Sequence, residues 1–421
     1  MDSLAKNITE KKLFENARVF IAPMRTQDVV TLEGSVLGGS NMLPRSLRET
    51  PFLASKLFDA GTKKHDKKNL RESLAARGAS LSFSAGGDRT YFSGSCLPED
   101  LPFLLQIVEE CLSTAVFQPA EISSTRERLL GRLKEQRTDT RTQASNELSR
   151  LLYDETHLNY AEKDAFQEKS LKSVTRAQLV DFRSSLGREG LVLAIVGDID
   201  TATALRAVER TFGRLAKGTQ TSVLKKKNTK APMMQEKRIS IAEKTNIDIF
   251  LGCVVPLTYE SPEYLPLSVL THMLGGSFAA HLMQTVRERD GLTYGIQSYL
   301  SDFGKDLEGS FRIWATFSPD LYERGVQTIR KEVKNFLSAG LTENALTQKK
   351  EERTGSYVIG LSTTGGLASL LHKIGREGKP LSYLDEYPRL IRALVVKDIR
   401  AAAPMINLDR LSLAVAGTFT K

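Results

Sequence analysis

The stretch LVLAIVG, residues 191–197, recurs late in the chain and sets the fold. Its unbroken apolar run ends at a glycine, which is typical of a strand that is buried on both faces. The near copy LSLAVAG occupies residues 411–417, an offset of 220 residues. At the same offset, the helix-opening residues 98–101 (PEDL) match residues 318–321 (SPDL). Two matches at one offset indicate that the chain contains a duplicated unit.

The sequence around these matches mixes strands with helices. Residues 80–97 alternate in polarity around a Gly-Gly-Asp turn, as two antiparallel strands do. Residues 98–117 follow a helical period, and we expect the highly charged residues 120–151 to form one long helix. Another helix, residues 175–186, leads into the apolar strand. We therefore predict an α+β fold of two homologous domains, each a mainly antiparallel sheet with helices packed on one face.

The length of 421 residues is too great for one ordinary hydrophobic core and also predicts two domains. Between the copies lies a polar, lysine-rich segment with a proline and no regular periodicity, which is typical of a linker. We place the N-terminal domain at residues 1–217, the linker at residues 218–235 and the C-terminal domain at residues 236–421.

The composition excludes several classes of protein. Hydrophobic residues make up 41% of the chain and charged residues 26%, as in a soluble globular protein. No apolar run reaches the ~18 residues of a membrane helix, and residues 1–14 lack the pattern of a signal peptide. The net charge of +9 lies partly in two lysine runs, residues 63–68 and 225–230. Because these runs lack interleaved aromatic residues, they predict solvated loops and no nucleic-acid partner. We also expect no membrane insertion.

The cysteines and histidines do not form a metal site. Cys96, Cys111 and Cys253 lack metal-ligand spacing and predict free or buried thiols, not a disulfide framework. His272 and His281 are nine residues apart, which does not place two imidazoles on one face of a helix. The thiols are compatible with either the cytoplasm or the periplasm.

One motif carries the residues of a possible active site. In HLMQTVRERDGLTYG, residues 281–295, Arg287 and Tyr294 flank an Asp-Gly break without a nucleophile beside them. The motif follows a Gly-Gly-Ser turn, in which we expect Gly275 to end one helix and Ser277 to cap the next. A purely structural alternative is that Arg287 forms a surface ion pair and the Tyr294 ring packs on a strand. Arg289 is the nearest competitor for the role of the arginine.

Residues 237–300 as a whole resemble the second domain of the insulinase/pitrilysin-type metallopeptidases, which include mitochondrial processing peptidase. The similar pieces are the apolar strand at residues 247–255, the helix ending in HMLGGSF, the segment VRERDGLTYG and the strand pair after it. The resemblance covers most of the chain and implies a domain pair that forms half of a clamshell. The Gly-Gly-Ser turn is a short version of the family's glycine-rich loop, which favours a bacterial relative.

Active members of this family hold zinc in the first domain, on an H-x-x-E-H helix and a distal glutamate. That helix runs into a Gly-Thr turn, which here is residues 61–62. Counting back, Phe52, Ser55 and Lys56 stand at the three motif positions, and the distal position falls near Gly131 or Arg132. Neither H-x-x-E-H nor H-E-x-x-H occurs anywhere in the sequence. The resemblance therefore implies no zinc or other cofactor in this chain.

The resemblance also implies roles for the Arg/Tyr pair. Arg287 would hold substrate backbone oxygens, and Tyr294 would donate a hydrogen bond to the oxyanion of peptide hydrolysis. We predict a non-catalytic subunit, inactive alone, that supplies both residues to the zinc site of a homologous H-x-x-E-H-bearing partner. Unfolded peptides would be its substrates.

Two alternatives from other classes stay open. The chain could be a structural subunit of a larger complex, like the core proteins of a respiratory complex that resemble this family. It could also be a non-enzymatic, peptide-binding homodimer.

Overall fold

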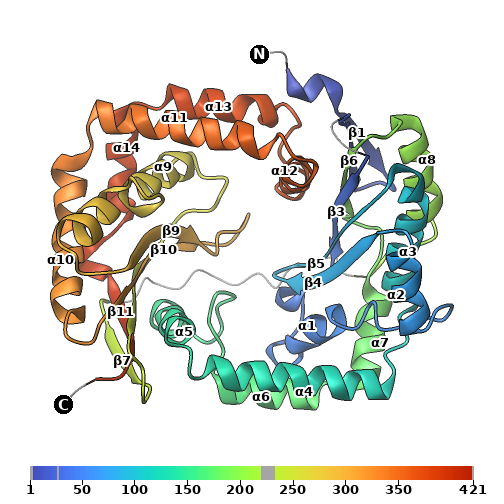
Figure 1. Cartoon of the computed structure of the whole chain (residues 1–421), viewed down its shortest axis with the longest axis horizontal. Coiled ribbons are helices and arrows are strands. Elements are labelled where there is room, and N and C mark those ends of the chain that lie inside the picture. Colours follow the sequence, from blue (N-terminus) through green and yellow to red (C-terminus); the bar gives the residue numbers. More distant parts are fainter. Residues whose placement is uncertain (1–2, 26–27, 220–232, 420–421) are drawn as a thin grey trace. The chain divides into compact units, whose positions relative to one another are not determined.

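The computed structural model describes residues 3–25, 28–219 and 233–419. It contains two compact units, each built around one β-sheet (Figure 1).

The first sheet has six strands in the order β1-β2-β6-β3-β5-β4. The predicted apolar strand is β6 (Val192–Gly197), and all six of its residues are buried. It is parallel to β2 (Ala17–Pro23) and antiparallel to β3 (Val30–Leu37). The remaining strands are β1 (Thr9–Leu13), β4 (Ser80–Gly86) and β5 (Arg89–Cys96).

The second sheet has five strands in the order β7-β11-β8-β10-β9. The predicted copy of β6 is β11 (Ser412–Gly417), again buried throughout. It is parallel to β7 (Glu236–Ser240) and antiparallel to β8 (Ile247–Val255). The remaining strands are β9 (Gly295–Ser301) and β10 (Gly309–Phe317).

The two sheets share one topology, since the order β7-β11-β8-β10-β9 repeats the order β2-β6-β3-β5-β4 strand for strand. Their registers agree as well. Val30 pairs with Gly197 in the first sheet, and Ile247 pairs with Gly417 in the second. The duplicated α+β architecture predicted from the sequence is confirmed.

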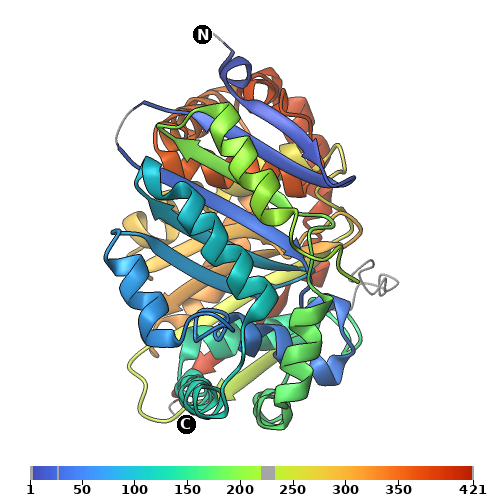
Figure 2. The ribbon, with the colours of Figure 1, turned by 90° about the vertical axis from the view of Figure 1, so that its right-hand side faces the viewer.

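Helices cover one face of each sheet, as predicted, and a further helix packs on the opposite face. In the first unit, α3 (Leu101–Thr114) and α8 (Thr201–Phe212) lie across one face of the sheet (Figure 2). Phe212 of α8 stacks on Phe92 of β5 with 6.0 Å between ring centroids. The other helices of both units are α1 (Glu49–Ser55), α2 (Lys67–Ala75), α6 (Asp164–Ser173), α7 (Arg176–Ser185), α9 (Tyr264–Gly275), α10 (Tyr322–Asn335), α11 (Glu343–Gly360), α13 (Tyr383–Ala393) and α14 (Val396–Ala402).

The opposite face of each sheet carries a helix from the other half of the sequence. In the first unit, α12 (Thr364–Arg376) packs on β6 and β3, where Leu371 joins Phe20 in one core. In the second unit, α5 (Thr140–Leu152) packs on β8 and β11, where Leu148 joins Phe250. The first unit thus comprises the described residues within 3–131, 165–219 and 356–388, and the second those within 132–164, 233–355 and 389–419.

The charged stretch at residues 120–151 is two helices, so the single helix expected from the sequence is wrong. α4 (Pro119–Gln136) ends before Asp139, and α5 begins after it. The Asp139 carboxylate accepts a hydrogen bond from the Thr142 amide at 2.7 Å. An aspartate in this extended N-cap conformation satisfies a free amide at the helix start and interrupts the preceding helix.

The sequence also led to predictions about the linker, the cysteines and membrane-spanning helices. Most of the expected linker at residues 218–235 lies outside the described residues, because residues 220–232 are not among them. The lysine run at residues 225–230 lies within this range. The three cysteines are free and buried, as expected. Within the described ranges, no helix is long and apolar enough to cross a bilayer.

Replacing either of two helical glycines by alanine should change the stability of the protein, in opposite directions. A Cβ atom at Gly375 of α12 would lie 2.5 Å from Val192 Cγ1 on the first sheet, whereas Gly355 of α11 has nothing within 4 Å. We expect Gly375→Ala to destabilise the protein by about 1–3 kcal/mol through overpacking. Gly355→Ala should stabilise it by up to ~1 kcal/mol, because alanine favours the helix. Urea denaturation of both variants measures these changes, and a stabilising Gly375→Ala would contradict the close packing of α12.

Candidate functional site

The Arg/Tyr motif begins with a π-helix, Met283–Arg289, that follows α9 in the second unit. The Asp290 amide donates to the Thr285 carbonyl, five residues back, at 3.0 Å. Gly291 then adopts a left-handed φ of +62° and reverses the chain. Its amide bonds to the Arg287 carbonyl at 3.0 Å, so the residues leading to Tyr294 fold back against the end of the π-helix. Such π-helical turns occur frequently at functional sites.

Arg287 is the arginine that remains available for a ligand. Its Nε lies 3.5 Å from a Glu288 oxygen, and its guanidinium lies 5.2 Å from the centroid of the Phe278 ring. Arg289, in contrast, forms two hydrogen bonds to Asp290, at 2.7 and 2.8 Å, and one to Glu332 at 3.3 Å. These bonds raise the pKa of Arg289 and use its Nε and Nη2 donors. Arg289, the alternative to Arg287 in the sequence, is therefore already held in ion pairs.

Tyr294 projects from a fixed backbone. The neighbouring Thr293 is buried, and its hydroxyl bonds to the carbonyls of Gly295 and Thr316. The Tyr294 side chain itself is 86% exposed, and its hydroxyl has no hydrogen-bond partner among the described residues. The structural alternative holds in part: Arg287 does form an ion pair with Glu288, but the Tyr294 ring does not pack on the strand. A phenol held in this way can donate to a bound molecule.

The turn before the motif is braced by charged side chains. Gly275 ends α9 as expected. Ser277 does not cap the next helix, so that prediction is wrong: its hydroxyl accepts from the Lys349 ammonium at 2.5 Å and donates to Glu352 at 3.4 Å. Lys349 and His272 also bond to Glu352, at 2.5 and 2.9 Å. Burial alone would raise the pKa of the Glu352 carboxyl, but the hydrogen bonds from Lys349 and His272 hold it below its usual range.

The residues at the positions of the zinc motif belong to α1 and its end, in the first unit. Phe52 is 37% exposed, and the buried Ser55 donates its hydroxyl to the Phe52 carbonyl at 2.8 Å. The Lys56 ammonium lies 5.8 Å from the centroid of the Phe52 ring. Zinc binds thiolate, imidazole or carboxylate ligands, and a lysine ammonium has no lone pair to offer. The side chains here do not fit the ion.

The distal position fits no better. Gly131 has no side chain, and Arg132 adds a cation on α4. Over the described ranges, no three His, Cys, Asp or Glu side chains are grouped as a metal site.

Comparison with known proteins agrees with the fold. A profile described as Insulinase (Peptidase family M16) matches residues 18–163, and one described as Peptidase M16 inactive domain matches residues 173–353. The chain belongs to peptidase family M16.

Individual M16 relatives are distant in sequence. An uncharacterized zinc protease of Streptomyces coelicolor is 24% identical over 389 residues, which are 90% of this chain and 83% of that protein. Among solved structures, a peptidase M16 inactive domain from Pseudomonas fluorescens is 22% identical, covers 98% of both chains and has a TM-score of 0.87. A protease from Helicobacter pylori is 15% identical, covers 97% of this chain and 99% of its own, and has a TM-score of 0.86. At these identities, the solved structures establish the fold alone.

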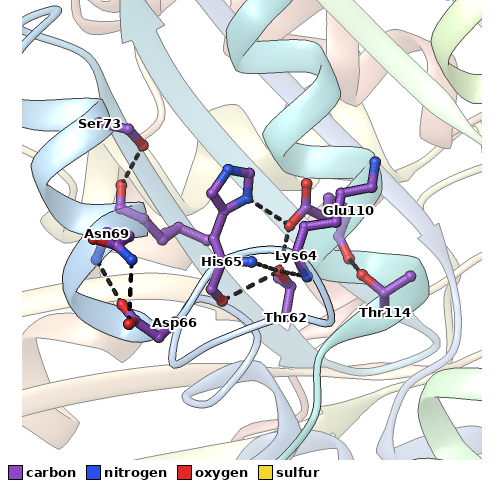
Figure 3. A network of polar contacts seen from close by, with 9 residues as sticks. Thr62, Lys64, His65, Asp66, Asn69, Ser73, Glu110 and Thr114 are labelled. Carbon is purple, nitrogen blue, oxygen red and sulfur yellow. Dashed lines mark hydrogen bonds and ion pairs between the residues drawn. The ribbon is translucent and has the colours of Figure 1, made fainter.

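The Gly-Thr turn of this M16 chain contains a polar network that the sequence did not predict (Figure 3). A Glu110 carboxylate oxygen lies 2.8 Å from His65 Nδ1 and accepts a hydrogen bond from the Thr62 hydroxyl. The Thr62 hydroxyl in turn accepts from the backbone amides of Lys64 and His65. The Glu110 side chain is only 1% exposed. One imidazole and one carboxylate are too few to hold zinc, so the network braces the turn. In the sequence, the position of Glu110 among the apolar residues of α3 was the feature that could have predicted this network.

We expect the isolated M16 chain to contain no stoichiometric zinc after purification in zinc-supplemented buffer. Its motif positions provide one phenyl, one hydroxyl and one ammonium group, none of which is a zinc ligand of the usual kind. Elemental analysis by plasma mass spectrometry measures the content, with an H-x-x-E-H-bearing homologue as the positive control. One zinc per chain, lost on replacing Lys56 by alanine, would overturn the assignment of these positions.

Proposed function

We propose that this chain is the non-catalytic subunit of a heterodimeric zinc peptidase. Its partner is a homologous M16 chain that carries H-x-x-E-H, and the substrates are unfolded peptides. This chain contributes Arg287 and Tyr294 to the partner's site and is inactive alone. A peptide adding as a strand to a sheet edge of the partner gains backbone hydrogen bonds with little demand on its sequence.

One observation carries this proposal. The Tyr294 side chain is 86% exposed, between residues whose backbone is fixed, and its hydroxyl has no partner among the described residues. An exposed phenol without a structural contact gains little for folding, but it is suited to donate to a ligand. In the same chain, Phe52, Ser55 and Lys56 offer no ligands for a metal. These observations support a chain that contributes residues to a peptidase site and leaves the metal to its partner.

The chemistry assigns a distinct task to each residue. Peptide hydrolysis places negative charge on the former carbonyl oxygen, and a neutral donor fixed beside it lowers the barrier. Tyr294 supplies that donor. Arg287 offers several donors in a planar fork, which suits the carbonyl oxygens of an extended peptide. The ion pair with Glu288 involves Nε, so the two terminal nitrogens of the guanidinium can still donate to such oxygens.

Reconstitution with the partner tests the proposal. The purified chain and an H-x-x-E-H-bearing homologue from the same organism are assayed alone and mixed, with a quenched fluorogenic peptide. Activity should appear only in the mixture. Arg287→Ala should lower its kcat/KM by roughly 10- to 100-fold, chiefly through KM, because charged hydrogen bonds to substrate contribute about 1.5–3 kcal/mol.

The matched control is Arg210→Ala, which removes an exposed arginine from α8 in the other unit. It should leave kcat/KM unchanged. If the two chains co-purify but the mixture cleaves no peptide, a structural or peptide-binding complex is favoured. If the Arg287→Ala complex is as active as wild type, the proposed role of Arg287 is wrong.

A further inference from the structure

Phe278 places an apolar ring on the surface beside Arg287. It lies in the turn between α9 and the π-helix, and its side chain is 60% exposed. Apolar surface left in water costs roughly 25 cal/mol per Å², so an exposed phenyl gains free energy when a ligand covers it. The Arg287 guanidinium lies over one side of the ring, 5.2 Å from its centroid.

The turn presents this ring in a fixed position. On one side, Lys349 and Glu352 bind the Ser277 hydroxyl at 2.5 and 3.4 Å. On the other, the side-chain amide of Gln284 donates a hydrogen bond to the Phe278 carbonyl at 3.0 Å. The preceding glycines pack closely, since a Cβ at Gly275 would lie 2.7 Å from the Ser298 amide nitrogen. The backbone that carries Phe278 is therefore held from both ends, which suits a specific contact.

We propose that Phe278 determines specificity by contacting a large apolar side chain of the peptide that Arg287 and Tyr294 bind. This inference rests on the proposed function and adds a substrate class to it. Arg287 bonds to the peptide's backbone oxygens, while the exposed face of the Phe278 ring covers a neighbouring side chain. Peptides with a leucine or phenylalanine at that position are preferred over peptides with a polar residue of similar size.

Matched peptides test the preference in the reconstituted complex. In each pair, one position among the three on either side of the cleaved bond carries leucine or asparagine. With wild type, one position should show a leucine preference in kcat/KM of about tenfold or more, the range for one apolar contact. Phe278→Ala should abolish that preference by slowing the leucine peptide alone. Phe278→Leu should retain most of it, and Leu97→Ala, which removes another exposed apolar side chain in the first unit, should change nothing.

The outcomes separate this inference from the proposed function. If Arg287→Ala impairs both peptides of a pair but Phe278→Ala leaves the leucine preference intact, the inference fails and the proposed function stands. If Phe278→Ala and Phe278→Leu slow both peptides equally, the ring only positions Arg287, and the inference also fails. If Arg287→Ala and Tyr294→Phe change no rate at all, the proposed function itself falls.

Discussion

Tyr294→Phe should lower the kcat of the reconstituted complex by about 10²–10³-fold and leave KM nearly unchanged. The substitution removes one hydroxyl from a side chain that is 86% exposed, so the fold loses no contact with it. The lost interaction is one that strengthens as charge develops on the peptide oxygen. Removal of a single donor of this kind raises the barrier by about 2.7–4 kcal/mol. A deficit in kcat alone identifies an interaction made in the transition state.

Steady-state kinetics with saturating partner measure this effect, and Tyr299→Phe serves as the control. Tyr299 lies on β9, five residues after Tyr294, and packs against the core around α5. Removal of the Tyr299 hydroxyl should leave kcat within a factor of about two, since this side chain packs in the core and is not proposed to contact the substrate. A Tyr294→Phe complex with wild-type kcat would show that the phenol does not act on the reacting oxygen.

A second large effect is expected from His372, which fixes α12 on the first sheet. Its Nε2 lies 2.7 Å from the Ser35 hydroxyl of β3, and that hydroxyl accepts from Arg89 Nε at 2.7 Å. The Ser35 proton is then able to point at His372 Nε2, an arrangement that suits a neutral imidazole. Burial, together with the charges of Arg89 and Arg376, lowers the pKa of His372 to about 3. Tyr91 packs edge-on against the ring.

Acid should therefore lower the free energy of unfolding, because His372 takes up a proton more readily in the unfolded chain. The folded pKa of His372, about 3, lies below the ordinary value of 6.5. Its contribution is fully present above pH 6.5 and is lost as the pH falls toward 3, because the unfolded chain binds the proton first. Between pH 7 and pH 5, the loss is about 2 kcal/mol. Urea unfolding from pH 8 to pH 4.5 measures it.

His372→Gln keeps a hydrogen-bonding group but cannot take up a proton, so its stability should fall less steeply with acid. At pH 8, the variant should be the less stable protein, since it loses the fit of the imidazole between Ser35 and Tyr91. The difference should shrink or reverse by pH 5. Parallel pH curves for the two proteins would contradict the neutral, buried state of this histidine.

The sequence predicted most of the fold because its signals were local and repeated. The apolar runs that became β6 and β11, and the strand pair β4 and β5, follow periodicities within ten residues or so. The packing partners of α5 and α12 could not be predicted, since an apolar helix face does not specify which sheet it covers. The break at Asp139 was visible as an N-cap residue, but it lay within a uniformly charged stretch.

For the candidate site, the sequence identified Arg287 and Tyr294 but not their surroundings. The ion pairs that occupy Arg289 join it to Glu332, which is 43 residues away in the chain. Phe278 looked like any other phenylalanine until its exposure of 60% was known. Local motifs thus gave the residue types, whereas availability for a ligand depended on contacts made over long sequence distances.

The exchange of α5 and α12 between the two sequence halves has a thermodynamic consequence. Each unit buries a helix whose flanking chain segments belong to the other unit, so each core requires residues from both halves of the sequence. Two modules joined only by a tether would melt independently. Here neither sequence half contains a complete core, so we expect the folding of the two units to be coupled.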